Sequence, residues 1–245
     1  MDRRIREERG RYAARGGFAH ERKVRDEFAN WQQSFKAKEW LELMGFGLST
    51  ISCIDAERPT EHGKTDVRLR VMLKDGTVHT ENISCKKGGG NQIDKRWVDD
   101  YANEFGFSET TRYALKKFTG EAGYTPGDLL VRDEISQSKY NSLKDKRRFT
   151  FPELDSPEQQ AILTDFRTNK MALIQFLLQS SSVNAPKWFM KGWQLIPMEE
   201  AIRLATSDGQ VVPTRTGFRI GDIKVQRKGG TPDPTKLQFK WDGIS

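Results

Sequence analysis

The sequence has only two cysteines among its 245 residues, Cys53 and Cys85, and neither lies in a CxxC motif or a histidine-rich context. It therefore offers no motif for zinc binding or redox chemistry. Such sparse use of cysteine is typical of a reducing, cytoplasmic compartment. The three histidines, His20, His62 and His79, form no visible pair, and we interpret each as structural or incidental.

Long apolar runs are also missing. No stretch of about 18 apolar residues occurs anywhere, so we expect no membrane span. The first residues are charged rather than apolar, and we expect no signal peptide. These two absences predict a soluble protein of the cytoplasm.

Basic residues outnumber acidic ones by 41 to 34, which gives a net charge of +7 and a pI near 9.4. Such a surface attracts polyanions, including nucleic acids. A soluble basic protein without a nucleic-acid partner would have the same composition. A chain of this length can form one large domain or two closely packed lobes, each with its own core.

The N-terminal part shows a helical pattern. Apolar residues recur at steps of four, three and four from Val24 to Phe35. This spacing predicts one long amphipathic helix from His20 to about Met44, with its aromatic stripe packed in the core.

A β-hairpin is predicted next. Residues 66–73 alternate apolar and polar side chains, as a half-buried strand does. Lys74-Asp75-Gly76-Thr77 supplies a turn, and residues 78–86 can return as the antiparallel neighbour. Asp66 and Lys86 would then lie near the same end of the hairpin.

The remaining chain mixes helices and short strands. We expect helices at about 91–105 and 108–118, and a third helical stretch from Ser156, as N-cap, to about Gln179. Short apolar alternations from Val211 onward predict a small antiparallel sheet. This order of elements indicates a mixed α/β protein.

Residues 120–152 are rich in glycine, proline and polar side chains, which favours a lobe boundary in this region. We therefore divide the chain into a lobe of residues 1–125 and a lobe of residues 126–245.

The hairpin carries the strongest chemical candidates. Hydrolysis of a phosphodiester needs a hard cation, an in-line water and a positive group beside the developing charge. Asp66 offers oxygen ligands for Mg²⁺, and Ser84 and Lys86 share one face of the return strand, with Cys85 pointing into the core. On spacing alone, a solvated turn aspartate and a surface lysine explain these residues equally well.

The pattern of Asp66 followed by Ser84-Cys85-Lys86 resembles the PD-(D/E)XK nuclease superfamily. The surrounding sequence is similar to that of the HinP-type restriction endonucleases, small type II enzymes that cut GCGC sites. The segments that carry this resemblance are Gly90-Asn91-Gln92-Ile93-Asp94-Lys95-Arg96-Trp97, Phe118-Thr119-Gly120-Glu121, Lys144-Asp145-Lys146-Arg147-Arg148, Val225-Gln226-Arg227-Lys228-Gly229-Gly230 and Leu237-Gln238-Phe239-Lys240. The resemblance extends from the predicted first helix to Lys240.

The resemblance implies a mixed sheet flanked by helices, with residues 1–125 as the catalytic lobe and residues 126–245 as a smaller α+β recognition lobe. It implies Mg²⁺-dependent hydrolysis of duplex DNA at a short palindromic site, GCGC or a close variant. It also implies action as a monomer on DNA and a companion DNA methyltransferase as functional partner.

Residue by residue, Asp66 matches the family's metal-binding aspartate and Lys86 its catalytic lysine. Ser84 falls where relatives carry glutamine or asparagine, and a serine hydroxyl is a shorter and poorer metal ligand. The remaining metal ligands would then be the backbone carbonyl of Cys85 and an outer carboxylate from Glu21. As an alternative, Glu21 is an acid favoured at a helix start.

The resemblance also implies a DNA-reading surface. Gln226, Arg227 and Lys228 match its recognition segment, with the two basic residues contacting guanine, and Gln92 and Lys95 match positions that lie against the target site. Paired donors of this kind are suited to base edges in the major groove. For each basic residue taken singly, a phosphate contact is the alternative.

The basic run at residues 144–148 has no apolar alternation. Lys146 and Arg147 are expected to clamp the phosphate backbone, and a solvated surface run is the alternative. Two further functions stay open: a DNA-binding module whose site has degenerated at Ser84, and a repair or junction nuclease built on the same core.

Overall fold

The computed structural model describes residues 3–60, 63–88, 91–180, 184–206, 209–228 and 235–243. The chain forms two compact units. Unit 1 comprises residues 1–10, 92–177 and 204–242, and unit 2 comprises residues 11–91, 178–203 and 243–245. Within the described ranges, no helix combines the length and the apolar character needed to cross a membrane.

The boundary expected at residues 125/126 differs from this division, because it falls inside unit 1. The chain instead enters unit 1 at Gln92, returns to unit 2 at Leu178 and enters unit 1 again at Leu204. A boundary drawn from turn-forming residues missed these crossings, since residues 120–152 form short helices and turns that belong to unit 1.

Unit 2 contains a five-stranded sheet in the order β1-β2-β3-β5-β6, in which β3 and β5 are parallel and the other neighbours antiparallel. Its elements, with the bounds of each, are α1 (Arg3–Ala29, whose first turns are counted with unit 1), α2 (Phe35–Leu43), a 3-10 turn (Leu48–Thr50), β1 (Ile51–Glu57), β2 (Val67–Leu73), β3 (Val78–Lys86), β5 (Trp188–Lys191), β6 (Gln194–Pro197) and the start of α9 (Met198–Ala205).

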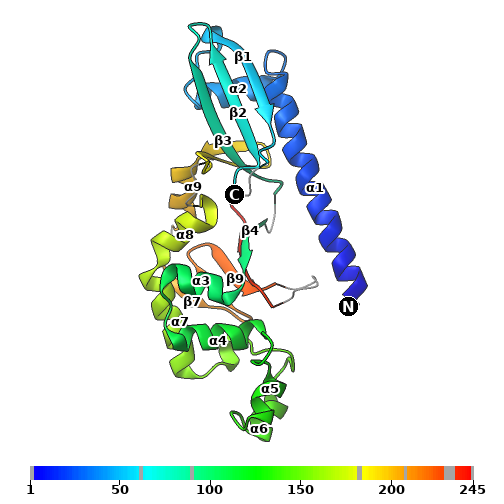
Figure 1. The fold of residues 1–245 in the computed structure, drawn as a ribbon, viewed down its shortest axis with the longest axis vertical. Helices are drawn as coiled ribbons and strands as arrows, with labels where there is room; N and C mark the ends of the chain where they lie inside the picture. The colour runs from blue at the N-terminus through cyan, green and yellow to red at the C-terminus, as the bar shows by residue number, and fades with distance from the viewer. Residues whose placement is uncertain are drawn as a thin grey trace. The chain divides into compact units, whose positions relative to one another are not determined.

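The helices α1 and α2 cover this sheet. Figure 1 shows α2 behind β1 to β3 and α1 along their side. Fully buried side chains from α1, α2 and β2 share one core, including Phe28, Leu41 and Leu69. Most of the predicted aromatic stripe therefore packs inward, whereas Phe35, the first residue of α2, is 74% exposed.

The single helix predicted from His20 to Met44 is wrong, because the chain forms two helices with a break after Ala29. The backbone carbonyl of Asn30 accepts from the N–H groups of Gln33 and Ser34 at 2.9 and 3.0 Å. The Ser34 hydroxyl then caps α2 by accepting from the N–H of Ala37 at 3.0 Å. A serine N-cap starts a new helix even where the apolar spacing continues unbroken.

The predicted hairpin is confirmed as β2 and β3, which pair antiparallel from Val67–Ile83 to Met72–Val78. In its turn, Gly76 adopts φ of +89°, a conformation that favours glycine. The Asp75 carboxylate accepts from the N–H of Thr77 at 2.9 Å. The turn thereby fixes the register that places Asp66 opposite the end of β3.

Unit 1 contains a second five-stranded sheet, in the order β4-β10-β9-β8-β7. Its elements are β4 (Asn91–Arg96), α3 (Val98–Phe105), α4 (Glu109–Thr119), α5 (Pro126–Val131), α6 (Gln137–Ser142), a 3-10 turn (Phe151–Glu153), α7 (Ser156–Thr168), α8 (Lys170–Leu178), β7 (Val211–Pro213), β8 (Phe218–Ile220), β9 (Ile223–Arg227) and β10 (Leu237–Trp241). The predicted C-terminal antiparallel sheet is confirmed by the pairing of β7, β8, β9 and β10.

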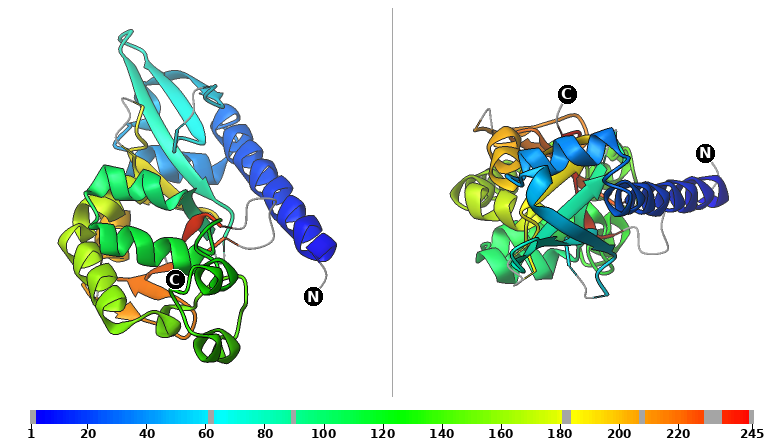
Figure 2. Two further views of the ribbon diagram at one scale, coloured as in Figure 1. Left: turned by 60° about the horizontal axis from the view of Figure 1, so that its bottom comes forward. Right: turned by 90° about the horizontal axis from the view of Figure 1, so that it is seen from above.

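Aromatic side chains join the helices of unit 1 to this sheet. Phe166 of α7 packs against Phe218 and Phe239 with ring centroids 4.8 and 6.5 Å apart, and Tyr101 of α3 lies 5.0 Å from Phe239. Figure 2 shows the helices of unit 1 and its orange and red C-terminal strands from a second side. These contacts bind the helices of unit 1 to β8 and β10.

Two predictions for unit 1 need correction. The helix expected over 91–105 is a strand, β4, followed by α3, because the Asp100 carboxylate accepts from the N–H of Trp97 at 3.1 Å and starts the helix at Val98. The N-cap of α7 is Asp155 rather than Ser156, since Glu158 at the third helical position accepts from the Asp155 N–H at 3.0 Å.

Candidate active site

Asp66 lies directly before β2 and gathers donors from the end of β3. Its own N–H donates to the Ile83 carbonyl at 2.9 Å, which holds the two strands together at this point. Its Oδ2 accepts from the backbone N–H of Cys85 at 2.7 Å, from Lys86 Nζ at 3.2 Å and from the Ser84 hydroxyl at 3.3 Å. The structure thus brings the predicted Asp66, Ser84 and Lys86 into one constellation.

Lys86 occupies the position of a cation in this constellation. Its ammonium donates to both Asp66 Oδ2 and the carbonyl oxygen of Cys85, the latter at 3.1 Å. These are the two oxygens expected to bind a metal. An ammonium group that already bridges them shows that the oxygens converge closely enough to hold a positive charge.

The donor set suits Mg²⁺ better than a softer metal. Among the described residues, no group of three or more His, Cys, Asp or Glu side chains has metal-binding geometry. Mg²⁺ keeps several of its waters and needs only one or two carboxylates. Asp66 and the Cys85 carbonyl fit this small requirement, and the Asp66 side chain is 24% exposed, which leaves room for water.

Glu21 lies in the C-terminal half of α1, not in the first turn of a helix, so its interpretation as a helix-start acid is wrong. Burial raises the pKa of Glu21, and the neighbouring Asp66 raises it further, whereas Arg58, Lys86 and Arg25 lower it. Because Asp66 contributes to the raised pKa of Glu21, the two carboxylates lie near one another. Such a pair is relieved by a divalent cation.

Ser84 and Cys85 point to opposite sides of β3, as alternation predicts. Ser84 is buried and directs its hydroxyl to Asp66. The Cys85 side chain belongs to the core of unit 2, and burial raises the pKa of its thiol well above the usual value. The thiol is therefore neither a nucleophile nor a metal ligand, and only the backbone of Cys85 takes part in the site.

The predicted DNA-binding residues all lie in unit 1, five of them on or beside β4 and β9 and two, Lys146 and Arg147, in the segment after α6. The Gln92 Oε1 accepts from Lys228 Nζ at 2.8 Å and from Gln238 Nε2 at 2.7 Å. Gln238 Oε1 in turn accepts from Gln226 Nε2 at 3.0 Å. Three predicted residues thus form one hydrogen-bonded network through a fourth, which is called the amide network below.

The other predicted residues surround this network unequally. Lys95 lies close enough to contribute to the lowered pKa of Lys228, although burial is the larger cause. Burial also lowers the pKa of Arg227, with further lowering from Arg148 and Arg147 and an opposing effect from Asp145. Arg227 and the basic run therefore share one region of unit 1.

The two residues predicted to clamp phosphates behave differently. Arg147 donates to the carboxylate of Asp145 from Nε and Nη2 at 2.9 and 3.1 Å. The Lys146 ammonium turns back to the carbonyls of Tyr140 and Asn141 and lies 4.6 Å from the Tyr140 ring centroid. The structure places Arg147 near Arg227 and turns Lys146 toward α6.

Gln238 is the site residue that the sequence analysis missed as a candidate. It pairs directly with Gln226 across β9 and β10 and is only 3% exposed. The sequence signal was present, since a glutamine alternates there with Leu237 and Phe239. Its burial was not predictable, because it depends on Gln92 from a distant strand.

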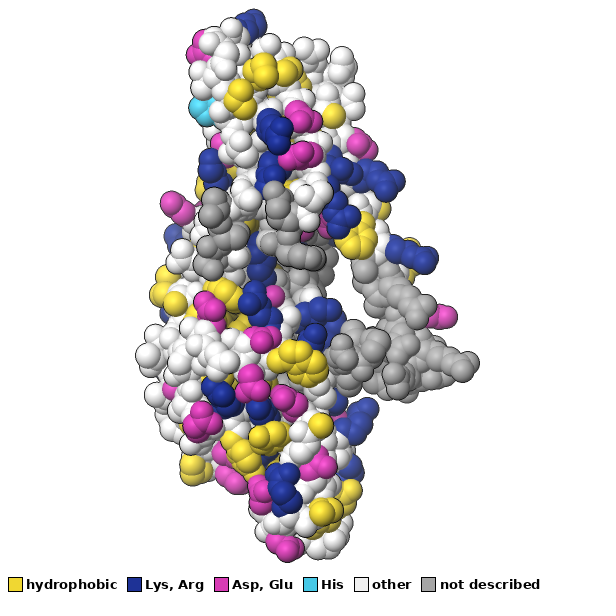
Figure 3. All heavy atoms as spheres, in the orientation of Figure 1, with side chains coloured by type: hydrophobic (Ala, Val, Ile, Leu, Met, Phe, Trp, Pro, Cys, Tyr) yellow, Lys and Arg dark blue, Asp and Glu magenta, His cyan; other side chains and the backbone are white. Residues whose placement is uncertain are grey.

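Charge alone does not outline either site. On the face drawn in Figure 3, Lys and Arg side chains are interspersed with Asp and Glu. His62 and the predicted Gly229-Gly230 turn lie outside the described residues. His79 lies 5.4 Å from the Phe46 ring in an edge contact, which agrees with a structural role.

Comparison with known proteins places these sites in context. The family model described as R.HinP1I restriction endonuclease matches residues 44–244. The crystal structure of restriction endonuclease MspI in complex with its cognate DNA is similar with a TM-score of 0.57 and 12% identity, covering 95% of this chain and 91% of that chain. No curated protein matches the sequence significantly. The predicted PD-(D/E)XK nuclease fold and the resemblance to the HinP-type enzymes are confirmed.

Proposed function

The chain belongs to the R.HinP1I restriction endonuclease family, and from this premise we propose that it hydrolyses duplex DNA at GCGC or a close palindromic variant, using Mg²⁺. Membership makes the protein a type II restriction endonuclease that binds DNA. The observation that carries the metal mechanism is the convergence of Asp66 Oδ2 and the Cys85 carbonyl on one cationic group, the Lys86 ammonium.

In this proposal, Asp66 and the Cys85 carbonyl hold the metal, with Glu21 as an outer carboxylate. Bound Mg²⁺ supplies charge neutralisation at the phosphate and a water of lowered pKa. Lys86 keeps a protonated amine beside these oxygens, where it stabilises the negative charge that develops or orients the water. Ser84 acts through Asp66, because its hydroxyl donates to that carboxylate and is not free to attack phosphorus.

The amide network supports the proposal of direct base reading. Two donors occupy the Gln92 oxygen, so its amide nitrogen is left to donate, whereas Gln226 uses its nitrogen and keeps its oxygen as an acceptor. Guanine offers acceptors in the major groove and cytosine a donor. Arg227, Lys228 and Lys95 supply positive donors for guanine, and Arg147 and Lys146 supply contacts to backbone phosphates.

We further propose that the enzyme acts in the cytoplasm as a monomer with one active site. Cleavage of a short palindrome would damage the host genome, which contains many such sites. A companion DNA methyltransferase is therefore the expected functional partner.

Incubation of unmethylated plasmid with the protein and Mg²⁺ tests the proposal. We expect discrete fragments whose sequenced ends share one palindrome, and their loss for Asp66→Ala. Asp55→Ala is the matched control, because Asp55 is an exposed aspartate on β1 of the same sheet. Intact plasmid with retained DNA binding would indicate a degenerate binding module, and cutting at branched DNA only would indicate a junction nuclease.

A further inference from the structure

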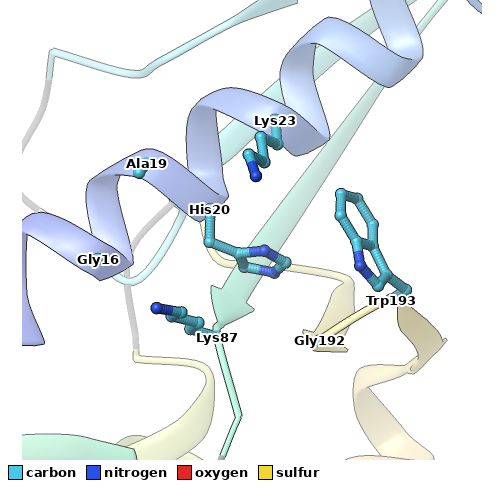
Figure 4. Close-up of a pocket in the computed structure, with 7 residues that line it drawn as sticks. All are labelled: Gly16, Ala19, His20, Lys23, Lys87, Gly192 and Trp193. Atoms are coloured by element: carbon cyan, nitrogen blue, oxygen red, sulfur yellow. The ribbon is translucent and has the colours of Figure 1, made fainter.

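A hollow of about 290 Å³ lies in unit 2 beside the candidate active site. It is bounded by α1, by the residue after β3 and by the residues after β5 (Figure 4). The side chains that give it chemical character are His20, Lys23, Lys87 and Trp193. None of these residues has a role in the proposed metal site.

His20 carries unused hydrogen-bonding capacity. Its side chain is 8% exposed, and its Nε2 has no hydrogen-bond partner in the structure. A buried polar atom without a partner indicates a missing water, ion or ligand. The ring is held in place by a hydrogen bond to the backbone of Gly192 and by an edge contact with Trp193 at 5.2 Å.

The hollow is positively charged. Lys23 and Lys87 both line it together with His20. The ammonium groups of the two lysines and the His20 imidazole can donate hydrogen bonds, and none of the residues that line the hollow is acidic. This combination fits an anion.

We propose that this hollow binds a backbone phosphate of DNA next to the phosphate at which the strand is cut. His20, Lys23 and Lys87 bind this phosphate. The proposal rests on the proposed nuclease function. His20 precedes Glu21 on α1, and Lys87 follows Lys86 at the end of β3. Each element thus contributes one residue to the active site and the adjacent residue to the hollow.

Trp193 forms a wall rather than a platform for a base. Its indole is stacked against Trp40 with ring centroids 6.0 Å apart and an interplanar angle of 9°. The Lys36 ammonium lies 4.0 Å from its ring centroid, and His20 contacts it edge-on. With these neighbours in place, the ligand is held by charge and hydrogen bonds, which favours a phosphate over a stacked base.

Gly16 makes room for one of the cations. A Cβ added at Gly16 would lie 3.0 Å from Lys87 Nζ, whereas a Cβ added at Gly17 would meet nothing within 4 Å. Glycine inside a helix costs about 1 kcal/mol relative to alanine. The glycine at position 16 therefore lowers the stability of the helix but leaves space for the Lys87 ammonium beside α1.

This pair of glycines supplies a matched experiment. Dissociation constants for a GCGC duplex are measured against salt concentration, with Ca²⁺ in place of Mg²⁺, for wild type, Gly16→Ala, Lys87→Gln and Gly17→Ala. Loss of one phosphate contact reduces the slope of log K against log salt by about 0.9. We expect this reduction for Lys87→Gln, a smaller one for Gly16→Ala, whose methyl group displaces only the flexible end of the Lys87 side chain, and the wild-type slope for Gly17→Ala. An unchanged slope for Lys87→Gln would overturn the proposal.

A second measurement identifies the phosphate. Single neutral methylphosphonate linkages are placed in turn across the duplex, and one linkage should weaken wild-type binding by roughly tenfold but leave Lys87→Gln unaffected. Inorganic phosphate is added separately while the His20 imidazole is followed by NMR. If inorganic phosphate binds but no methylphosphonate linkage weakens DNA binding, the ligand of the hollow is a free anion. That result would overturn the proposal of a DNA backbone phosphate.

The outcomes separate this pocket from the nuclease function. If the wild type cleaves plasmid and all variants show the same salt slope, the phosphate site is refuted and the nuclease function is supported. If the wild type does not cleave plasmid but the salt slopes still distinguish Gly16→Ala from Gly17→Ala, the nuclease function is refuted and the phosphate site is supported. Gly17→Ala also controls for altered helix stability, because both substitutions favour the helix.

Discussion

Two lysine–carboxylate pairs, one in each unit, differ in their exposure to solvent. In unit 1, Lys117 of α4 donates to both oxygens of Glu158 of α7 at 2.7 and 2.9 Å, and the side chains are 5% and 10% exposed. In unit 2, Lys86 lies 3.2 Å from a single oxygen of Asp66, and the side chains are 21% and 24% exposed. The first pair is closed to solvent and the second is open.

The difference shows what each pair can do. The Glu158 carboxylate is fully used, since it also accepts from the N–H of Asp155 at the start of α7. A buried pair of this kind holds two helices together and offers nothing to a ligand. Asp66 and Lys86 keep access to water, so a phosphate or a metal can exchange with their present contacts. Substitutions at Lys117, Lys86 and Ser84 test this contrast.

The largest effect is expected from Lys117→Met. Removal of the lysine leaves the Glu158 charge buried without its partner, which costs about 3–5 kcal/mol of unfolding free energy. Lys116→Met is the matched control, because the neighbouring Lys116 pairs with the more exposed Asp99 and such pairs contribute about 0–1 kcal/mol. Chemical denaturation measures both, and equal losses would show that the buried pair has no special structural role.

Lys86→Ala should affect catalysis instead of stability. Loss of a positive group at the developing charge lowers the cleavage rate by about 10²–10³-fold. The unfolding free energy should change by less than about 1 kcal/mol, since the pair is partly solvated. Single-turnover cleavage with Mg²⁺ and duplex binding with Ca²⁺ measure the two effects. Lys187→Ala, which removes an exposed lysine beside β5, should leave cleavage unchanged.

The open pair was the part of the site most accessible to prediction. Asp66 and Lys86 belong to one hairpin, and a hairpin's register follows from its turn and its alternating side chains. Glu21 was predicted in the first turn of a helix, whereas it lies in the C-terminal half of α1. Its nearness to Asp66 depends on how α1 packs on the sheet, which alternation cannot reveal.

The other errors also have physical causes. The break between α1 and α2 depends on the Ser34 cap, which the continuous apolar spacing concealed. The strand β4 was taken for a helix because its neighbours in the sheet come from the far end of the chain. Sheet pairing between distant segments also explains the misplaced boundary at 125/126.

The amide network provides a test at the recognition site. Gln238→Leu removes the link between Gln92 and Gln226, so Gln226 loses its partner and Gln92 is held by Lys228 alone. Discrimination between a GCGC duplex and one with a single changed base pair should fall by about 1–3 kcal/mol. Gln160→Leu, at an exposed glutamine of α7, should preserve it. Equal weakening on both duplexes would assign Gln238 to general stability.

Ser84→Ala should have the smallest effect and decides what the serine does. The lost hydrogen bond to Asp66 is 3.3 Å long, and the Cys85 N–H at 2.7 Å and Lys86 at 3.2 Å still hold the carboxylate. A bond of this kind contributes about 0.5–1.5 kcal/mol, so cleavage should slow by no more than about tenfold with an unchanged Mg²⁺ requirement. Ser84→Asn, which supplies the amide that relatives carry, should lower the Mg²⁺ concentration for half-maximal cleavage. Complete loss of cleavage in Ser84→Ala would instead make the hydroxyl a metal ligand, and the open pair would then need a third side chain to work.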